Sequence, residues 1–384
     1  MNINTDSKPF LIKSDNLEKL RPSIIKVTNL IKKAVSEKRQ IVIRHHDDCD
    51  GYTAGLVLEK AIKSIINDHK PQYLCTRQLS RSPYFDYIDA LREANNFMSG
   101  YKRVAPLIIL TDLGSNSQSM KSIQRLSDFG FDFIIVDHHR FDIENKEIAK
   151  GFVNPHEFDM GSSLNAGALA TEIALFINPL LTDLTHLPAL SGVADKSSGT
   201  DFEEYLKLSG YTKDELMEWG LVIDHDTYYL RFNPRSELME SLFFPNENQK
   251  IVIKTMSKEI DQGFDDIKLA AKKFSSVKNI GNLKLVMIEK HKVCHRDYAS
   301  SKIVRITHEL YDGPRITFAL TPDSISYRAD EVDFKGPALI KELKEKFPFA
   351  LINGGGHDVA GSIRFNEASR DEVIEFLIES ITKI

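Results

Sequence analysis

The chain has 384 residues, of which 42% are hydrophobic and 27% charged, ordinary values for a globular protein of two or three domains. A formal net charge of −5 does not support a globally basic nucleic-acid binder, although a local basic groove remains compatible with it. No apolar run approaches the ~20 residues that cross a bilayer, so we expect no membrane partner. Residues 1–16 carry no secretory signal and the three cysteines give no disulfide framework, which favours a cytoplasmic protein.

The first part of the chain alternates helical patterns with short apolar runs. An amphipathic helix is predicted before residue 39, and Ile- and Val-rich runs predict buried strands at 41–44, 107–111 and 133–136. Amphipathic stretches between these runs predict helices. The alternation predicts a doubly wound α/β domain with a mainly parallel sheet over residues 1–205.

The rest of the chain divides into two further predicted parts. Residues 206–280 are predicted to form a helical linker. Residues 281–384 are predicted to form a smaller α/β domain, with strands at 283–290, 315–320 and 324–329, a helix at 298–311 and a final amphipathic helix.

Acidic and imidazole side chains follow each predicted strand of the first domain. They are His45, His46, Asp48 and Asp50 after the first strand, Asp112 after the second, and Asp137, His138 and His139 after the third. Sites in open α/β sheets form beyond the carboxyl ends of the strands, so we expect these side chains to converge. Divalent cations would neutralise the repulsion among the carboxylates.

This ligand chemistry favours two Mn²⁺ ions. Mixed imidazole and carboxylate ligands suit Mn²⁺ better than Mg²⁺, which is the alternative. Two ions roughly 3.5–4 Å apart can hold an attacking hydroxide and a phosphoryl oxygen together.

Five ordered motifs resemble those of a known superfamily. The stretches "HHDDCDG", "LIILTDLGS", "VDHH" and "ALSGVADKS" resemble, in order, the four motifs of the DHH phosphoesterase superfamily. The later "NGGGHDVAGS" resembles the signature of its C-terminal partner domain, DHHA1. The form "HxDxDG" at 46–51 resembles the RecJ-like branch, including its archaeal relatives. The resemblance implies a metal-dependent exonuclease acting on single-stranded DNA or RNA.

The resemblance also implies a role for each site residue. It implies one ion bound by His46 and Asp48, a second bound by Asp50, His138 and Asp195, and Asp112 bridging both. It further implies that Asp137 orients His138 through its other ring nitrogen and that His139 faces the scissile phosphate. Because the histidine is doubled, His45 is an alternative to His46.

The C-terminal domain is expected to bind the substrate. Gly354, Gly355 and Gly356 would let the backbone approach a phosphate or base closely, with N–H groups as donors. His357 would project toward the substrate. Arg328 can make bidentate contact with phosphate, and Arg364 lies nearby in sequence.

Other interpretations of these residues remain open. The acids at 47–50 could form a turn and a helix cap. The enzyme could instead be a nanoRNase, a pAp phosphatase or a cyclic-dinucleotide phosphodiesterase of the same superfamily, or, with less support, a polyphosphate hydrolase. A protein of a different class would be a non-catalytic replication or repair scaffold. Replication or repair proteins and a second copy of the chain are candidate partners. The "HKVCH" stretch lacks the spacing of a zinc site, although Arg296 after it could touch substrate.

Overall fold

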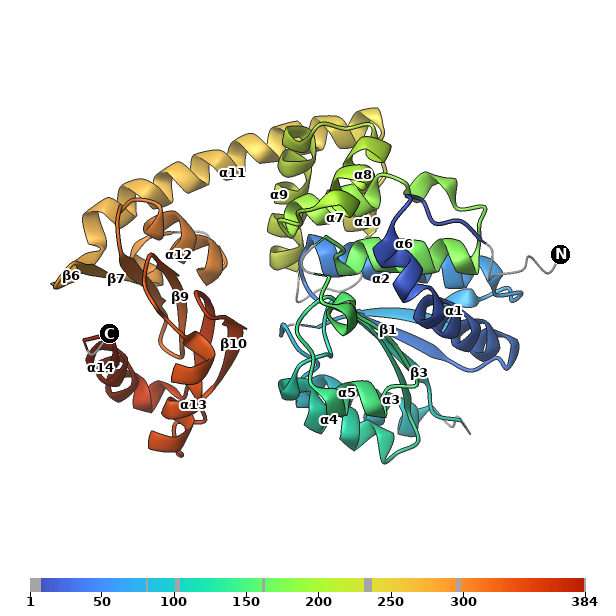
Figure 1. Ribbon diagram of the computed structural model, residues 1–384, viewed down its shortest axis with the longest axis horizontal. Coiled ribbons are helices and arrows are strands. Elements are labelled where there is room, and N and C mark those ends of the chain that lie inside the picture. Colours follow the sequence, from blue (N-terminus) through green and yellow to red (C-terminus); the bar gives the residue numbers. More distant parts are fainter. Residues whose placement is uncertain are drawn as a thin grey trace. The chain divides into compact units, whose positions relative to one another are not determined.

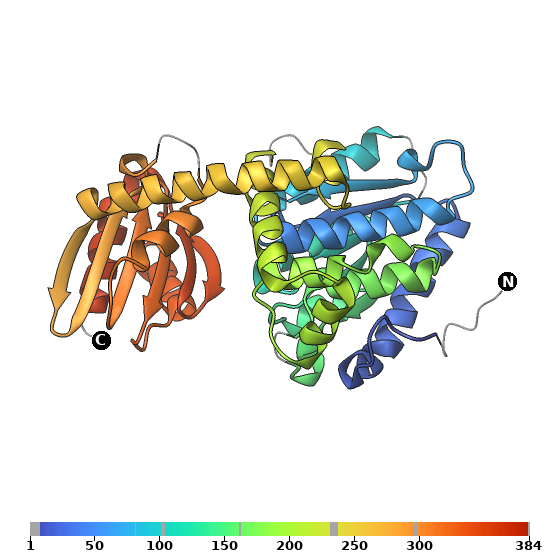
Figure 2. The same cartoon turned by 90° about the horizontal axis from the view of Figure 1, so that it is seen from above.

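The structure is a computed structural model that describes residues 8–80, 82–100, 104–160, 163–230, 237–294 and 298–382. It forms two compact units, Met1–Ser257 and Lys258–Ile384, each built around its own sheet (Figures 1 and 2). The predicted domain limits at residues 205 and 280 stay predictions. Across the described residues, no helix combines the length and apolar character that crossing a membrane requires.

The first unit alternates strands and helices before a run of helices. Its strands are β1 (Ile41–His45), β2 (Cys75–Leu79), β3 (Leu107–Thr111), β4 (Asp132–Val136) and β5 (Gly151–Val153). Its α-helices are α1 (Asp15–Ser36), α2 (Cys49–Ile65), α3 (Tyr87–Ser99), α4 (Ser117–Ser127), α5 (Ile143–Ile148), α6 (Ala166–Ile177), α7 (Leu187–Ala194), α8 (Thr200–Ser209), α9 (Lys213–Leu230) and α10 (Glu237–Ser241). Short 3₁₀ turns are η2 (Pro71–Tyr73), η3 (Pro155–Phe158) and η4 (Thr182–Leu184).

The sheet of the first unit is wholly parallel, with strand order β2-β1-β3-β4-β5. The predicted doubly wound α/β architecture is therefore confirmed. The register aligns His45, Thr111 and Val136, the last residues of β1, β3 and β4. The residues that follow them therefore leave the sheet at one edge, next to the point where the strand order reverses.

Helices cover both faces of this sheet, so alternating residues of the strands are buried on opposite sides. On one face Ile108, Leu110, Phe133 and Ile135 join a core with residues of α3 and α4. The other face is covered by α1, α2 and α6 (Figure 1). Because both faces are covered, the central strands read as continuous apolar runs in the sequence.

The second unit has a mixed six-stranded sheet of order β10-β11-β9-β8-β7-β6, in which only the pair β7–β8 is parallel. The strands are β6 (Ser276–Ile280), β7 (Leu283–Glu289), β8 (Arg315–Leu320), β9 (Ser324–Asp330), β10 (Asn353–His357) and β11 (Ala360–Arg364). The helices are α11 (Glu247–Phe274), which begins in the first unit, α12 (Ser300–His308), α13 (Gly336–Lys346) and α14 (Arg370–Ile381), with 3₁₀ turns η5 (Lys290–Lys292) and η6 (Glu367–Ser369).

Candidate metal centre

The turn between β1 and α2 supplies the first pair of candidate ligands. Asp48 is the N-cap of α2, and its Oδ1 accepts a hydrogen bond from the Gly51 N–H at 2.9 Å. The other oxygen, Oδ2, lies 2.7 Å from Nδ1 of His46. Asp48 therefore caps the helix, as the alternative interpretation of these acids predicted, and it also faces His46 as a metal ligand would.

Asp112 lies between two sets of donors at the end of β3. Its backbone has φ +57°, a left-handed conformation that asparagine and aspartate tolerate better than most residues. Its Oδ2 lies 3.5 Å from Nδ1 of His46, and its Oδ1 lies 3.1 Å from Nε2 of His138. One carboxylate thus faces a histidine from each of two loops.

The described candidate ligands fall into two groups that meet at Asp112. In what we call the loop group, His46, Asp48 and Asp112 each offer a donor atom within 4.8 Å of the others. The same holds in the convergent group, which consists of Asp50, His138 and Asp195. A further cluster, which overlaps both, comprises Asp112, Asp137, His138 and His139.

The convergent group is centred on the ring of His138. Oδ2 of Asp50 lies 3.6 Å from Nε2 of His138, and Oδ2 of Asp195 lies 3.6 Å from Nδ1. Asp195 is the residue at the C-terminal end of α7. The three ligands therefore come from three distant segments of the chain.

Asp50 is fixed by the start of α6, a support that the sequence did not reveal. Its Oδ1 accepts from the Gly167 N–H at 2.6 Å, and its Oδ2 from the Ala166 N–H at 3.1 Å. A Cβ at Gly167 would lie 2.4 Å from Oγ of Ser191 and 2.8 Å from Oδ1 of Asp50. Only glycine allows this approach.

The expected role of Asp137 in orienting the ring of His138 is wrong. Its Oδ1 instead accepts from Nδ1 of His139 at 2.8 Å and from the backbone N–H groups of His138 and His139. This local turn draws the Asp137 carboxylate toward the second histidine. The ring nitrogens of His138 face Asp112 and Asp195.

Buried amides tie the loops of the site together, and no pattern in the sequence marked them. Nδ2 of Asn154 donates to the His139 carbonyl at 2.9 Å and to Oγ of Ser115 at 3.2 Å. The Ser115 N–H donates to Oδ2 of Asp137 at 3.1 Å. Nδ2 of Asn145 donates to the carbonyls of Gly114 and Asn116 in the loop after β3.

His45 lies outside both groups. It is 1% exposed, its Nδ1 is 2.7 Å from the carbonyl of His46, and its Nε2 is 3.2 Å from Nη1 of Arg77. Burial and the Arg77 charge lower the pKa of His45 to about 3. The geometry therefore places His46, and not His45, among the carboxylates.

The electrostatics of the centre are those of crowded carboxylates. Burial and the neighbouring Asp112 carboxylate raise the pKa of Asp50 well above its ordinary value, and burial raises the pKa of Asp195 to about 6. Burial lowers the pKa of His138, but Asp112 and Asp195 outweigh it and raise the pKa well above its ordinary value. Mixed imidazole and carboxylate donors in this crowding fit divalent cations.

The predicted substrate residues lie in the second unit. Gly354, Gly355 and Gly356 belong to β10, which pairs with β11. Gly354 and Gly356 have positive φ, and a Cβ on either would lie within 2.5 Å of a carbonyl oxygen of β11. The hairpin itself therefore requires these two glycines.

Two arginines accompany this hairpin. Arg328 on β9 is half-buried and registers with Ala360, and Arg364 is exposed at the end of β11. The side chain of His357 and the whole of Arg296 lie outside the described part of the chain.

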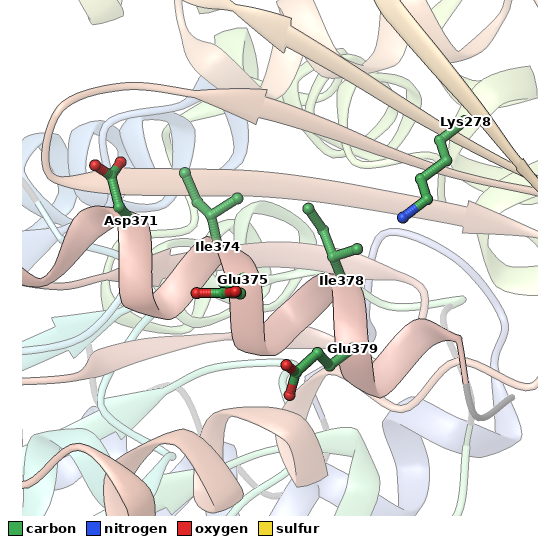
Figure 3. A pocket seen from close by; sticks show the side chains of 6 residues that line it. All are labelled: Lys278, Asp371, Ile374, Glu375, Ile378 and Glu379. Carbon is green, nitrogen blue, oxygen red and sulfur yellow. The ribbon is translucent and has the colours of Figure 1, made fainter.

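A shallow groove of about 360 Å³ in the second unit involves other residues (Figure 3). Ile374 and Ile378 of α14 line it, together with Lys278 of β6 and three acids of α14, Asp371, Glu375 and Glu379. None of the predicted substrate residues lines this groove.

Comparison with known proteins identifies the family. The N-terminal domain of the DHH family matches residues 40–185. A solved structure described as the DHH domain of a member of a family of ribosomal proteins is 30% identical, with a TM-score of 0.87 over 99% of this chain and 95% of that one. The chain belongs to the DHH family.

Two further kinds of relative extend this comparison. An uncharacterised protein of Methanocaldococcus jannaschii, MJ1198, is 29% identical over 97% of this chain, which spans 55% of that protein. The RecJ structure from Thermus thermophilus in complex with Mn²⁺ is 13% identical, with a TM-score of 0.64 over 99% of this chain and 56% of that one. The fold is therefore RecJ-like.

Proposed function

We propose that the chain is a divalent-metal phosphodiesterase that removes nucleotides from an end of single-stranded DNA or RNA. The observation that supports it best is the position of Asp112, whose two carboxylate oxygens face His46 and His138. A carboxylate shared between two donor sets is the arrangement that a two-metal phosphoryl-transfer site needs.

The donor chemistry suggests which residues would hold the ions. The loop group would hold one ion and the convergent group the other, with Asp112 between them. Divalent cations bound there would lower the pKa of water and neutralise phosphoryl oxygens. Imidazole from His46 and His138 favours Mn²⁺ over Mg²⁺, and RecJ structures with each of these ions share the fold.

The pair Asp137–His139 would supply a proton donor beside the ions. Asp137 accepts from Nδ1 of His139, so Nε2 can donate to a substrate oxygen only from the cationic ring. Burial lowers the pKa of His139, but the Asp137 carboxylate outweighs it and raises the pKa, which favours that cationic form. The His139 side chain is 42% exposed, whereas that of Asp137 is 1% exposed. His139 would therefore contact the phosphate, and the buried Asp137 would orient the His139 ring through Nδ1.

In the second unit we assign substrate binding to the β10–β11 hairpin and its neighbours. The backbone at Gly355, the guanidinium groups of Arg328 and Arg364, and His357 would bind phosphates. Replication or repair proteins and a second copy of the chain remain candidate partners. Light scattering during gel filtration would test self-association.

The decisive experiment digests end-labelled single strands with Mn²⁺, Mg²⁺ or EDTA. We expect Mn²⁺-dependent removal of nucleotides from one end of a ~40-mer, and little cleavage of a duplex. RNA and DNA are both included, because one relative is described as a ribosomal-protein family member. Cleavage confined to dinucleotides, pAp, cyclic dinucleotides or polyphosphate would replace the proposal with the corresponding small-substrate enzyme. Mn²⁺ binding without any hydrolysis would favour a scaffold.

A further inference from the structure

The doubled histidine at the end of β1 poses a question that the metal centre leaves open. His46 faces the carboxylates, whereas His45 is buried behind it and contacts none of them closely. The ring of His45 packs edge-on against Tyr52 with centroids 5.1 Å apart. A Cβ at Gly55 would lie 2.5 Å from Cδ2 of His45, so α2 leaves room for this ring through a glycine.

Hydrogen bonding fixes the tautomer of His45. A guanidinium group has donors only, so Nε2 of His45 accepts from Nη1 of Arg77 at 3.2 Å. The proton of the neutral ring is then on Nδ1, which donates to the carbonyl of His46 at 2.7 Å. The reverse tautomer would set two donors against each other at Nε2 and leave the carbonyl without this donor.

Arg77 is itself held from several sides. Its Nε donates to Glu59 at 2.8 Å and its Nη2 to Glu240 of α10 at 2.5 Å. Its guanidinium carbon lies 4.4 Å from the centre of the Tyr52 ring. Tyr52 in turn stacks on Phe243 at 5.1 Å, so the guanidinium has little freedom to turn.

We propose that His45 is a positioning residue for His46, and that Glu240 and Arg77 act on the metal centre through it. The chain of contacts runs from Glu240 to Arg77, to His45, and to the peptide of His46. The bond from Nδ1 fixes that peptide, so the imidazole of His46 stays directed at Asp48 and Asp112. The inference rests on the proposed function because it takes His46 as a metal ligand.

Mn²⁺ affinity of the folded protein tests this role apart from hydrolysis. We expect His45→Leu to weaken Mn²⁺ binding by roughly 10- to 100-fold, the usual effect of removing a group that orients a ligand. His45→Asn keeps an N–H donor near the position of Nδ1 and should stay within about threefold of the wild type. The measurements are calorimetric titration and the Mn²⁺ electron paramagnetic resonance spectrum, with folding checked in EDTA.

A double-mutant cycle tests the path through Arg77. Glu240→Gln should weaken Mn²⁺ binding by roughly two- to fivefold in the wild type and have no further effect in His45→Leu. Glu247→Gln, which removes an exposed partner of Lys250 on α11, is the matched control and should change nothing. If His45→Leu does not fold, the Mn²⁺ affinities of Arg77→Lys and Glu240→Gln test the inference instead, because both variants leave His45 in place.

Several results would overturn the inference. Wild-type Mn²⁺ affinity in folded His45→Leu would do so, as would equal losses in the Leu and Asn variants, or additive effects in the cycle. A wild type that binds no Mn²⁺ would overturn it together with the metal centre. A wild type that binds Mn²⁺ but cleaves no nucleic acid would remove the proposed nuclease function alone, and the same affinity comparison would still decide the role of His45.

Discussion

The two candidate ligand groups are built in different ways. In the loop group, His46 and Asp48 are two residues apart, and their side chains are 22% and 41% exposed. In the convergent group, Asp50 and His138 are 3% and 12% exposed; Asp50 lies in the first turn of α2 and His138 in the loop after β4. A turn and a helix cap suffice to form most of the first group, whereas the second needs α6 and α7 correctly packed. We therefore expect packing changes in α6 to damage the convergent group and to leave the loop group intact.

Asp112, where the groups meet, should give the largest effect. We expect Asp112→Asn to lower the rate of Mn²⁺-dependent hydrolysis by roughly 10³-fold or more, because it removes the charge that the two proposed ions would share. Asparagine tolerates the left-handed backbone, so the fold should persist. Single-turnover rates and circular dichroism measure the two quantities.

Asp159→Asn is the matched control for this variant. Asp159 is exposed, has φ +55° and lies in neither ligand group. The same change there should leave hydrolysis unaltered. Near-normal activity in Asp112→Asn, or an equal loss in Asp159→Asn, would contradict the shared role.

Neutralising one acid in each group compares them directly. Both Asp48→Asn and Asp50→Asn should reduce Mn²⁺ affinity, by roughly 10- to 100-fold. Asparagine keeps the helix cap but not the charge that faces Nδ1 of His46, so Asp48→Asn should cost about 1–3 kcal/mol of unfolding free energy. Asp50→Asn should cost less, because relief of the repulsion with Asp112 offsets the loss of one of the two N–H bonds from Ala166 and Gly167. Calorimetric titration measures the Mn²⁺ affinity, and urea unfolding in EDTA measures the free energy of unfolding. Equal stability losses in the two variants would contradict the predicted difference between the groups.

Gly167→Ala changes packing and leaves every candidate ligand in place. The added methyl group would approach Asp50 and Ser191 too closely, so α6 must shift. We expect a loss of about 1–3 kcal/mol of unfolding free energy and weaker binding of one Mn²⁺ ion only. Retention of two equally tight ions by calorimetry would show that the convergent group tolerates movement of α6.

Glu172, further along α6, is the residue for which we expect the smallest effect. Burial raises the pKa of its carboxyl to about 7, although Tyr205 and the Leu11 N–H donate to it. Between its ordinary pKa of 4.5 and about 7 the folded state keeps a proton that the unfolded state has released. The free energy of unfolding should therefore fall as pH rises across that window and level off above it.

The change should amount to at most roughly 3 kcal/mol. Glu172→Gln should remove this part of the pH dependence, measured by urea unfolding in EDTA from about pH 4.5 to about pH 7.5. The exposed substitution Glu247→Gln should leave the slope as in the wild type. An unchanged slope in Glu172→Gln would show that this carboxyl is ionised throughout.

Burial separates the strands that could be predicted from the sequence from those that could not. The apolar runs of β1, β3 and β4 predicted strands because these strands are covered on both faces. The edge strand β2, "CTRQL", is mostly half-buried and has three consecutive polar residues at its centre, so it contains no apolar run. The strand β10, "NGGGH", owes its form to pairing with β11, and glycine carries no strand preference.

The candidate ligands could be found from the sequence because chemistry and motif order single them out. Their supports could not be found in this way. Gly167 and Asn154 act through hydrogen bonds to residues far away in the chain, and no spacing predicts such partners. The sequence predicts a pairing of Asp137 with His138, whereas the carboxylate meets His139, because the path of a turn decides which of two adjacent rings it contacts.

Asp48 caps α2 with one oxygen and faces His46 with the other. An ion bound to Oδ2 would also restrict the motion of Oδ1, which accepts from the Gly51 N–H. Ion occupancy should thus be readable as slower hydrogen–deuterium exchange in the opening turn of α2, with no substrate or turnover required.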